Sequence, residues 1–185
     1  MLTHKMTIAG LDRYLPICPV NESLSIGAFV IFGDAELTVA CARDLLAAAP
    51  DYDYLITAEA KGIPLAHEMA RQRGDDYYFV ARKHPKLYMT SVFEVNVRSI
   101  TTNADQKLYL DGADAEKMKG KRILLVDDVI STGESLNALE VLVKQAGGII
   151  VGRACILAEG DAQNREDLTY LEKLPLFHPD GTVIE

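Results

Sequence analysis

The sequence lacks several features that would place it in familiar classes of protein. Its 185 residues include only three cysteines, Cys18, Cys41 and Cys155, which are scattered and form neither a C-x-x-C pair nor a Cys/His cluster. This pattern favours buried thiols over a disulfide framework or a zinc site. The sequence has no run of roughly eighteen apolar residues, and its first residues lack the apolar core of a signal peptide. We therefore expect a cytoplasmic protein with no membrane partner.

Acidic residues outnumber basic residues in this sequence. The chain has 19 Lys and Arg against 27 Asp and Glu, which gives a formal net charge of −8. Binding nucleic acid by neutralising its phosphates needs a basic footprint, so we expect no nucleic-acid partner. No internal repeat, linker or low-complexity segment interrupts a composition that is 49% hydrophobic and 25% charged. This is ordinary for a globular protein, and we predict a single domain over residues 1–185.

The most informative segment runs from Lys121 to Gly148. Its first part, 123–126, is continuously apolar and predicts a strand, and residues 135–145 have a mostly helical apolar spacing. Between them stand two acids, Asp127 and Asp128, and the run S-T-G-E-S. Backbone N–H groups at the start of a helix make an anion site that the helix dipole favours. A plain capped turn with solvated acids is the alternative.

Strand and helix patterns alternate along most of the chain. We expect strands at 54–57, 77–81, 149–157 and 176–177, and helices at 35–49 (N-capped by Asp34), 64–73 and 165–174. Residues 1–33, broken by Pro16 and Pro19, suit an irregular N-terminal cap better than a sheet. Residues 87–112 predict a β-hairpin with a polar tip at 101–105. The fold class is therefore α/β, with a doubly wound, mostly parallel sheet covered by helices on both faces.

Two more polar runs follow predicted strands. Glu59, Ala60, Lys61 and Gly62 come after 54–57, and the basic run from Arg82 to Lys86 comes after 77–81. In a parallel sheet, ligands bind at the carboxyl ends of strands. Taken alone, each run also fits an ordinary turn or a solvated edge.

The stretch V-D-D-V-I-S-T-G-E-S, residues 126–135, resembles the motif with which type I phosphoribosyltransferases bind phosphoribosyl pyrophosphate (PRPP). It departs at Glu134, where many members carry a second small residue. The run E-A-K-G at 59–62 resembles the diphosphate loop of the purine branch, the adenine and xanthine phosphoribosyltransferases, in which this turn often contains a cis peptide bond. The resemblance implies the type I fold, a homodimer, and a role for the 87–112 hairpin as a hood over the active site.

The same resemblance implies roles for particular residues. Asp127 and Asp128 would be catalytic, accepting hydrogen bonds from the ribose hydroxyls and placing Mg²⁺ directly or through water. The 5′-phosphate would be bound by Ser131, Thr132, Gly133, Glu134 (through its backbone) and Ser135. The diphosphate would meet Ala60, Lys61, Arg82, Lys83 and, more weakly, Lys86, and in some members the Arg-Lys pair reaches across the dimer interface.

The purine base is less determined. By resemblance, Asn21 and Glu159 are candidates for binding it, and the layout of Val20-Asn21, the hood at 98–101 and Glu159 is most similar to xanthine phosphoribosyltransferases. A carboxylate at 159 would instead suit the 6-amino group of adenine, which we favour over xanthine, hypoxanthine or guanine. Glu159 could alternatively cap the following turn, with the base read by backbone groups.

The rival from another class is a non-catalytic PRPP-sensing regulator, since purine-repressor effector domains resemble these enzymes. Such regulators carry a winged-helix domain in front, and the first residues of this sequence are too few and too acidic for one.

Overall fold

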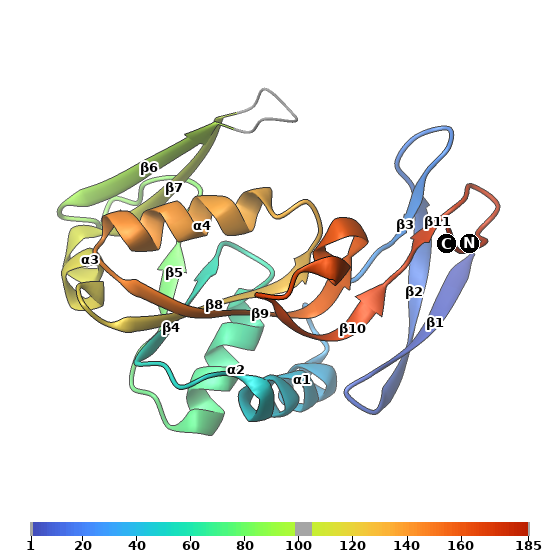
Figure 1. Ribbon diagram of the computed structural model, residues 1–185, viewed down its shortest axis with the longest axis horizontal. Coiled ribbons are helices and arrows are strands. Elements are labelled where there is room, and N and C mark those ends of the chain that lie inside the picture. The colour runs from blue at the N-terminus through green and yellow to red at the C-terminus, as the bar shows by residue number, and fades with distance from the viewer. Residues whose placement is uncertain (1, 99–104, 185) are drawn as a thin grey trace.

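The computed structural model describes residues 2–98 and 105–184 and contains three sheets (Figure 1). The central sheet has five strands, and its order is β10-β9-β8-β4-β5. All of its pairings are parallel. Its strands are β4 (Tyr54–Ala58), β5 (Phe79–Ala81), β8 (Arg122–Ile130), β9 (Ile149–Glu159) and β10 (Thr169–Leu174).

The chain winds through this sheet in two directions. From β4 it passes through α2 (Ile63–Arg73) to β5, whereas from β8 it passes through α4 (Glu134–Gln145) to β9 on the other side. Right-handed crossovers in opposite directions put their helices on opposite faces. Figure 1 shows α4 above the sheet, with α2 and α1 (Ala35–Ala48) below it. The doubly wound fold is confirmed, and its direction reverses between β4 and β8.

Each face of the sheet has its own hydrophobic core, as successive residues of β8 show. Leu125 belongs to the same core as Leu139 of α4, whereas Leu124 belongs to the other core, with Leu45 of α1 and Leu65 of α2. Side chains alternate between the faces of a strand, so a strand buried on both sides reads as an unbroken apolar run. Cys41 and Cys155 lie in these cores, and their burial raises the pKa of each thiol to about 12. All three thiols are free, as expected.

Residues 2–33 are more regular than we expected. The strands β1 (Thr3–Ile8), β2 (Leu11–Pro19) and β3 (Ser25–Gly27) form an antiparallel sheet that β11 (Leu176–Phe177) completes at one edge. The prediction of an irregular cap is wrong because both prolines lie near ladder ends: Pro16 pairs with Thr3, the first residue of β1, and Pro19 is the last residue of β2. There a missing N–H breaks little of the ladder.

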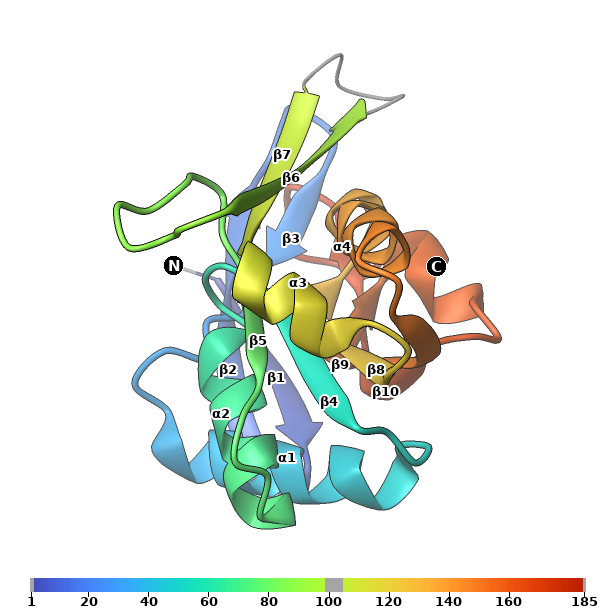
Figure 2. The same cartoon turned by 90° about the vertical axis from the view of Figure 1, so that its left-hand side faces the viewer.

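The predicted hairpin is present as β6 (Val92–Arg98) and β7 (Asp105–Asp111), which pair antiparallel. It extends beyond α4, as Figure 2 shows from the side. The predicted tip residues Thr101 to Ala104 lie outside the described part of the chain, as do Ser99 and Ile100 of the predicted hood contact. A short helix that we did not expect, α3 (Gly112–Met118), follows β7, and the Asp111 side chain accepts a hydrogen bond from its Ala113 N–H.

The helix predicted at 165–174 is wrong. A 3₁₀ turn, η1 (Gly160–Asn164), follows β9, and the chain then forms β10, which pairs with β9 from Thr169 to Leu174. The other predicted elements are present: the helix at 35–49 ends one residue early, and Asp34 caps it by accepting from Leu37 N–H at 3.1 Å. No helix within residues 2–98 and 105–184 is long and apolar enough to cross a membrane.

Candidate active site

A large polar cavity opens where the winding of the sheet reverses. Strands β4 and β8 are neighbours there, and ligands of open α/β sheets bind in the crevice at such a point. The cavity has a volume of about 730 Å³ and is lined by the ends of both strands, the chain after β5 and the hood. Its lining residues are Ala58, Glu59, Ala60, Lys61, Lys83, His84, Lys107, Leu108, Tyr109, Asp127, Asp128, Val129 and Ser135.

The loop after β4 packs tightly against the end of β8. The Glu59–Ala60 peptide bond is cis, as the resemblance implies. A Cβ at Gly62 would collide with Thr57 Oγ1 and would stand 3.1 Å from Asp127 Oδ1. Because Thr57 is fully buried, only glycine fits this position. The predicted diphosphate loop and the predicted catalytic acids are therefore direct neighbours.

The two acids stand inside strand β8 rather than in a loop, because the strand continues to Ile130. The alternative of a plain capped turn with solvated acids is wrong for Asp128, which is only 2% exposed. Asp127 Oδ1 accepts a hydrogen bond from Asp128 N–H at 2.8 Å. Lys61 Nζ stands 2.9 Å from Asp128 Oδ2, but their relative orientation does not make a hydrogen bond, so among the described residues this buried oxygen has a charge partner and no hydrogen-bond donor.

The environment of the acids opposes two negative charges. Burial, and then the negative charge of Asp128, raise the pKa of Asp127 well above its usual value. Positively charged groups or hydroxyl donors are therefore favoured at this place. The described residues contain no cluster of three or more side chains that would hold a metal ion alone. Two carboxylates do suit Mg²⁺, which proteins hold with one or two carboxylates together with substrate phosphates and water.

The predicted 5′-phosphate loop joins β8 to α4. Gly133 has a left-handed φ of 76° and stands directly before the helix, and no side chain caps the helix end. A recess of about 70 Å³ is lined by Asp127 and by residues 129–136 of this loop. The positive end of the α4 dipole faces it, which favours an anion.

The basic residues after β5 divide into two groups. Lys83 is exposed and lines the cavity, whereas Arg82 does not, because its Nε donates to Glu59 Oε2 at 3.0 Å and its Nη1 contacts the Tyr88 hydroxyl at 3.1 Å. Arg82 lowers the pKa of Glu59, which also accepts from Lys83 N–H at 3.0 Å. Lys86 is likewise absent from the cavity wall.

Two basic residues of the cavity wall escaped prediction. His84 belongs to the basic run but had no role assigned, and Lys107 comes from β7 of the hood. Lys107 also contacts Glu94 across the hairpin at 3.0 Å. Only the spacing of alternate residues in the hood could have suggested that position 107 faces the cavity.

Neither predicted base-binding residue lines the cavity. Glu159 is the last residue of β9 and is half-buried; its burial raises the pKa of the carboxyl, and the positive charge of Lys61 opposes that shift. Asn21 is exposed in the turn between β2 and β3, where its side chain accepts from Ser23 N–H at 2.9 Å.

Comparison with known proteins agrees with this geometry. Residues 35–174 match the phosphoribosyl transferase domain, and the chain belongs to this family. The hypoxanthine/guanine phosphoribosyltransferase of Methanococcus voltae is 36% identical over 113 residues, 61% of this chain and 56% of that protein. That of Methanotorris igneus is 34% identical over 111 residues, 60% and 56% of the two chains. The chain thus spans little more than half the length of these relatives.

Solved structures share the fold at lower identity. The adenine phosphoribosyltransferase of Thermoanaerobacter pseudethanolicus superposes with a TM-score of 0.71 at 21% identity, over 86% of this chain and 95% of that one. The Giardia lamblia enzyme, solved with 9-deazaadenine, gives 0.61 at 18% identity, over 77% and 82%. At such identities the likeness establishes the fold and leaves the base open.

Proposed function

We propose that the protein is a purine phosphoribosyltransferase, which transfers the phosphoribosyl group of PRPP to a purine base and releases diphosphate. The observation that carries this proposal is that E-A-K-G and D-D-V-I-S-T-G-E-S meet where the sheet reverses, with Gly62 packed on Asp127 and Lys61 paired with Asp128. Membership of the phosphoribosyl transferase family and the names of its relatives support it.

The reaction requires both ends of PRPP to be held. A purine nitrogen forms a bond to the anomeric carbon and releases its proton to water, while the bond from that carbon to the diphosphate oxygen breaks and the diphosphate leaves with the electron pair. Positive charge develops on the ribose, close to where Asp127 and Asp128 would accept hydrogen bonds from its hydroxyls. The 131–135 loop holds the 5′-phosphate, and Lys61, Lys83 and the backbone at Ala60 receive the diphosphate. Positioning and electrostatics supply most of the acceleration.

Arg82 and Lys86 start outside the cavity. Their direct contact with the diphosphate requires the chain after β5 to rearrange, because Arg82 donates to Glu59 beside the cis peptide bond. The hood, whose Lys107 already lines the cavity, is placed to exclude water from an oxocarbenium-like transition state.

Magnesium belongs to the proposal because the donor set fits it. Asp127 and Asp128 would hold it, directly or through water, together with oxygens of PRPP. When bound, the ion supplies positive charge that balances the departing diphosphate.

Adenine is our first candidate for the base. Glu159 carries the proposal, although it stands outside the cavity wall, so contact with the base requires the base to extend toward the end of β9. There the half-buried carboxylate would accept from a 6-amino group and oppose a 6-carbonyl. Hypoxanthine or guanine is second, and the names of the archaeal relatives favour it. Changing Glu159 to Gln should lower the adenine-to-hypoxanthine ratio of kcat/KM by about a hundredfold. An unchanged ratio would mean that backbone groups read the base.

The experiment for the reaction itself is incubation with radiolabelled PRPP and adenine, hypoxanthine, guanine, xanthine or orotate. We expect nucleotide from at least one purine and none from orotate. PRPP binding without nucleotide from any purine would instead support a PRPP-sensing regulator.

We also propose a homodimer. Leu87 and Tyr88 are 108% and 63% exposed directly after the basic run, an apolar pair that a partner subunit would cover. Light scattering that finds a fully active monomer at micromolar concentration would contradict a site shared between subunits.

A further inference from the structure

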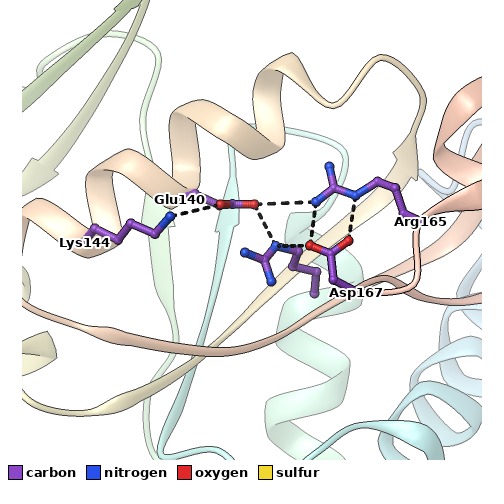
Figure 3. A network of polar contacts seen from close by, with 5 residues as sticks. Glu140, Lys144, Arg165 and Asp167 are labelled. Atoms are coloured by element: carbon purple, nitrogen blue, oxygen red, sulfur yellow. Dashed lines mark hydrogen bonds and ion pairs between the residues drawn. The ribbon is translucent and has the colours of Figure 1, made fainter.

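A cluster of five charged side chains lies beside the 131–135 loop (Figure 3). Its centre is Glu140 of α4, which accepts from Arg153 Nε of β9 at 2.7 Å. Lys144 approaches Glu140 at 3.4 Å from one side, and Arg165 approaches it at 3.7 Å from the other. Asp167 contacts both arginines, Arg165 at 2.9 Å and Arg153 at 3.4 Å. The cluster thus joins α4, β9 and the segment before β10.

Arg165 is held in this cluster by one edge of its guanidinium. Its Nε and Nη2 donate to the two carboxylate oxygens of Asp167, each at 2.9 Å, in the two-pronged geometry that fixes a guanidinium plane. Its third nitrogen, Nη1, points elsewhere: it stands 3.2 Å from the position that a Cβ at Gly133 would occupy.

Gly133 is the residue on which the shape of the loop depends. Its φ of 76° is left-handed, and the start of α4 has no side-chain cap to hold the preceding turn. The approach of Arg165 to Gly133 therefore supports a turn that, unlike those before α1 and α3, has no capping side chain. The guanidinium of Arg165 also places a positive charge beside Gly133 of the 131–135 loop.

We propose that Arg165 is a positioning residue for the 5′-phosphate. It fixes the backbone at Gly133, and with it the N–H groups of residues 131–135, and its charge adds to the attraction of the helix dipole for the phosphate. The assignment rests on the proposed function, because it takes the 131–135 loop to be the phosphate site. It predicts that Arg165 affects the phosphate end of PRPP and leaves the diphosphate end alone.

The test is calorimetric binding of two half-ligands, ribose 5-phosphate and inorganic diphosphate, with Mg²⁺ present. The variants are Arg165→Gln and, as matched control, Lys144→Gln, which removes a cation from the same cluster on the side away from the loop. We expect Arg165→Gln to weaken ribose 5-phosphate about tenfold, the loss of one good charge-assisted interaction. Its diphosphate Kd should stay unchanged, as should both Kd values of Lys144→Gln.

Asp167→Asn gives a second route to the same answer if Arg165→Gln folds poorly. The Asp167 side chain is half exposed, so we expect the substitution to be tolerated. The amide carries no charge and therefore holds the Arg165 guanidinium less firmly. We expect a smaller loss that is again confined to ribose 5-phosphate.

The outcomes are distinguishable. Equal weakening of both half-ligands, or no weakening of ribose 5-phosphate in either variant, would overturn the role of Arg165 while the proposed function stands. A wild-type protein that binds neither PRPP nor ribose 5-phosphate would overturn the proposed function, and this inference with it.

Discussion

Replacing Lys61 with Met should destabilise the protein in the absence of substrate, because the substitution removes the charge partner of Asp128. Asp128 is 2% exposed, and its Oδ2 has the Lys61 ammonium 2.9 Å away but, among the described residues, no hydrogen bond. Methionine keeps most of the length and apolar character of the lysine stem, so the change removes mainly the charge. An uncompensated carboxylate would remain in a nearly dry position.

The magnitude follows from the unequal burial of the two partners. Removing one member of a fully buried pair costs roughly 3–5 kcal/mol. The Lys61 side chain is 46% exposed, so water already screens it and would partly replace it. We therefore expect a loss of about 1–2 kcal/mol in the free energy of unfolding, or about 3–6 °C in Tm for a chain of this size.

The assay is urea and thermal unfolding in a chelator-containing buffer, with wild type, Lys61→Met, Asp128→Asn and the double variant forming a cycle. Asp128→Asn should restore most of the stability lost in Lys61→Met, because the amide carries no charge to bury. Lys83→Met, a change at an exposed lysine of the same cavity, should stay within about 0.5 kcal/mol of wild type. A Lys61→Met protein as stable as wild type, or a double variant no more stable than Lys61→Met, would refute the reasoning.

Two further predictions concern the packing of the β4 loop and the α4 cluster. Gly62→Ala should lower kcat/KM by about a hundredfold with far-ultraviolet circular dichroism unchanged, because the new Cβ meets Thr57 Oγ1 and displaces the loop from Asp127, and displacements near 1 Å have such effects. The control is Gly74→Asn, at a left-handed helix end with open space around it. Equal activity of the two variants would contradict the claim. Arg153 lowers the pKa of Glu140, so the stability that this carboxylate contributes is present above its unfolded pKa near 4.5 and is lost as pH falls through its folded pKa. Between about pH 5 and 3, the Tm of wild type should therefore fall more steeply than that of Glu140→Gln, and parallel curves would argue against the contribution.

Local patterns predicted the parts of the fold that local interactions determine. Residues 123–126 and 149–157 lie in β8 and β9, where burial on both faces selects continuous apolar runs. The helices at 35–49 and 64–73 were indicated by Asp34 as a cap and by Pro64 in the first turn. Because ligands bind at the carboxyl ends of parallel strands, the polar segments 59–62 and 127–128 were also expected at the same edge of the sheet.

The errors occur where distant segments decide the structure. Leu168, Leu171 and Leu174 are three residues apart and read as a helix face, yet residues 169–174 form β10 because the open edge of β9 offers a full parallel ladder. Periodicity alone does not reveal that edge. For the same reason β11, distant in sequence, completes the sheet of β1, β2 and β3.

The site shows the same limit at the level of side chains. The sequence indicated that Arg82 and Lys83 follow a strand, but it contained no sign that Arg82 turns to Glu59 while Lys83 faces the cavity. The burial of Asp128 was also hidden, because a polar residue after an apolar run looks like the start of a loop, whereas β8 continues through it. Lys107 lines the cavity because β7 is held beside the chain after β5 by the bridge between Arg82 and Tyr109, which are distant in sequence.

The central claim is that Asp127 and Asp128, at the reversal point of the sheet, act on PRPP. Its most direct test is the kcat for PRPP-dependent nucleotide formation by the Asp127→Asn, Asp128→Asn double variant, with the base that wild type uses best. We predict that turnover is abolished while near-ultraviolet circular dichroism and Tm show an intact fold, since asparagine preserves the shape of each acid and removes its charge. A folded double variant that keeps more than a modest fraction of wild-type kcat would contradict the assignment of this site.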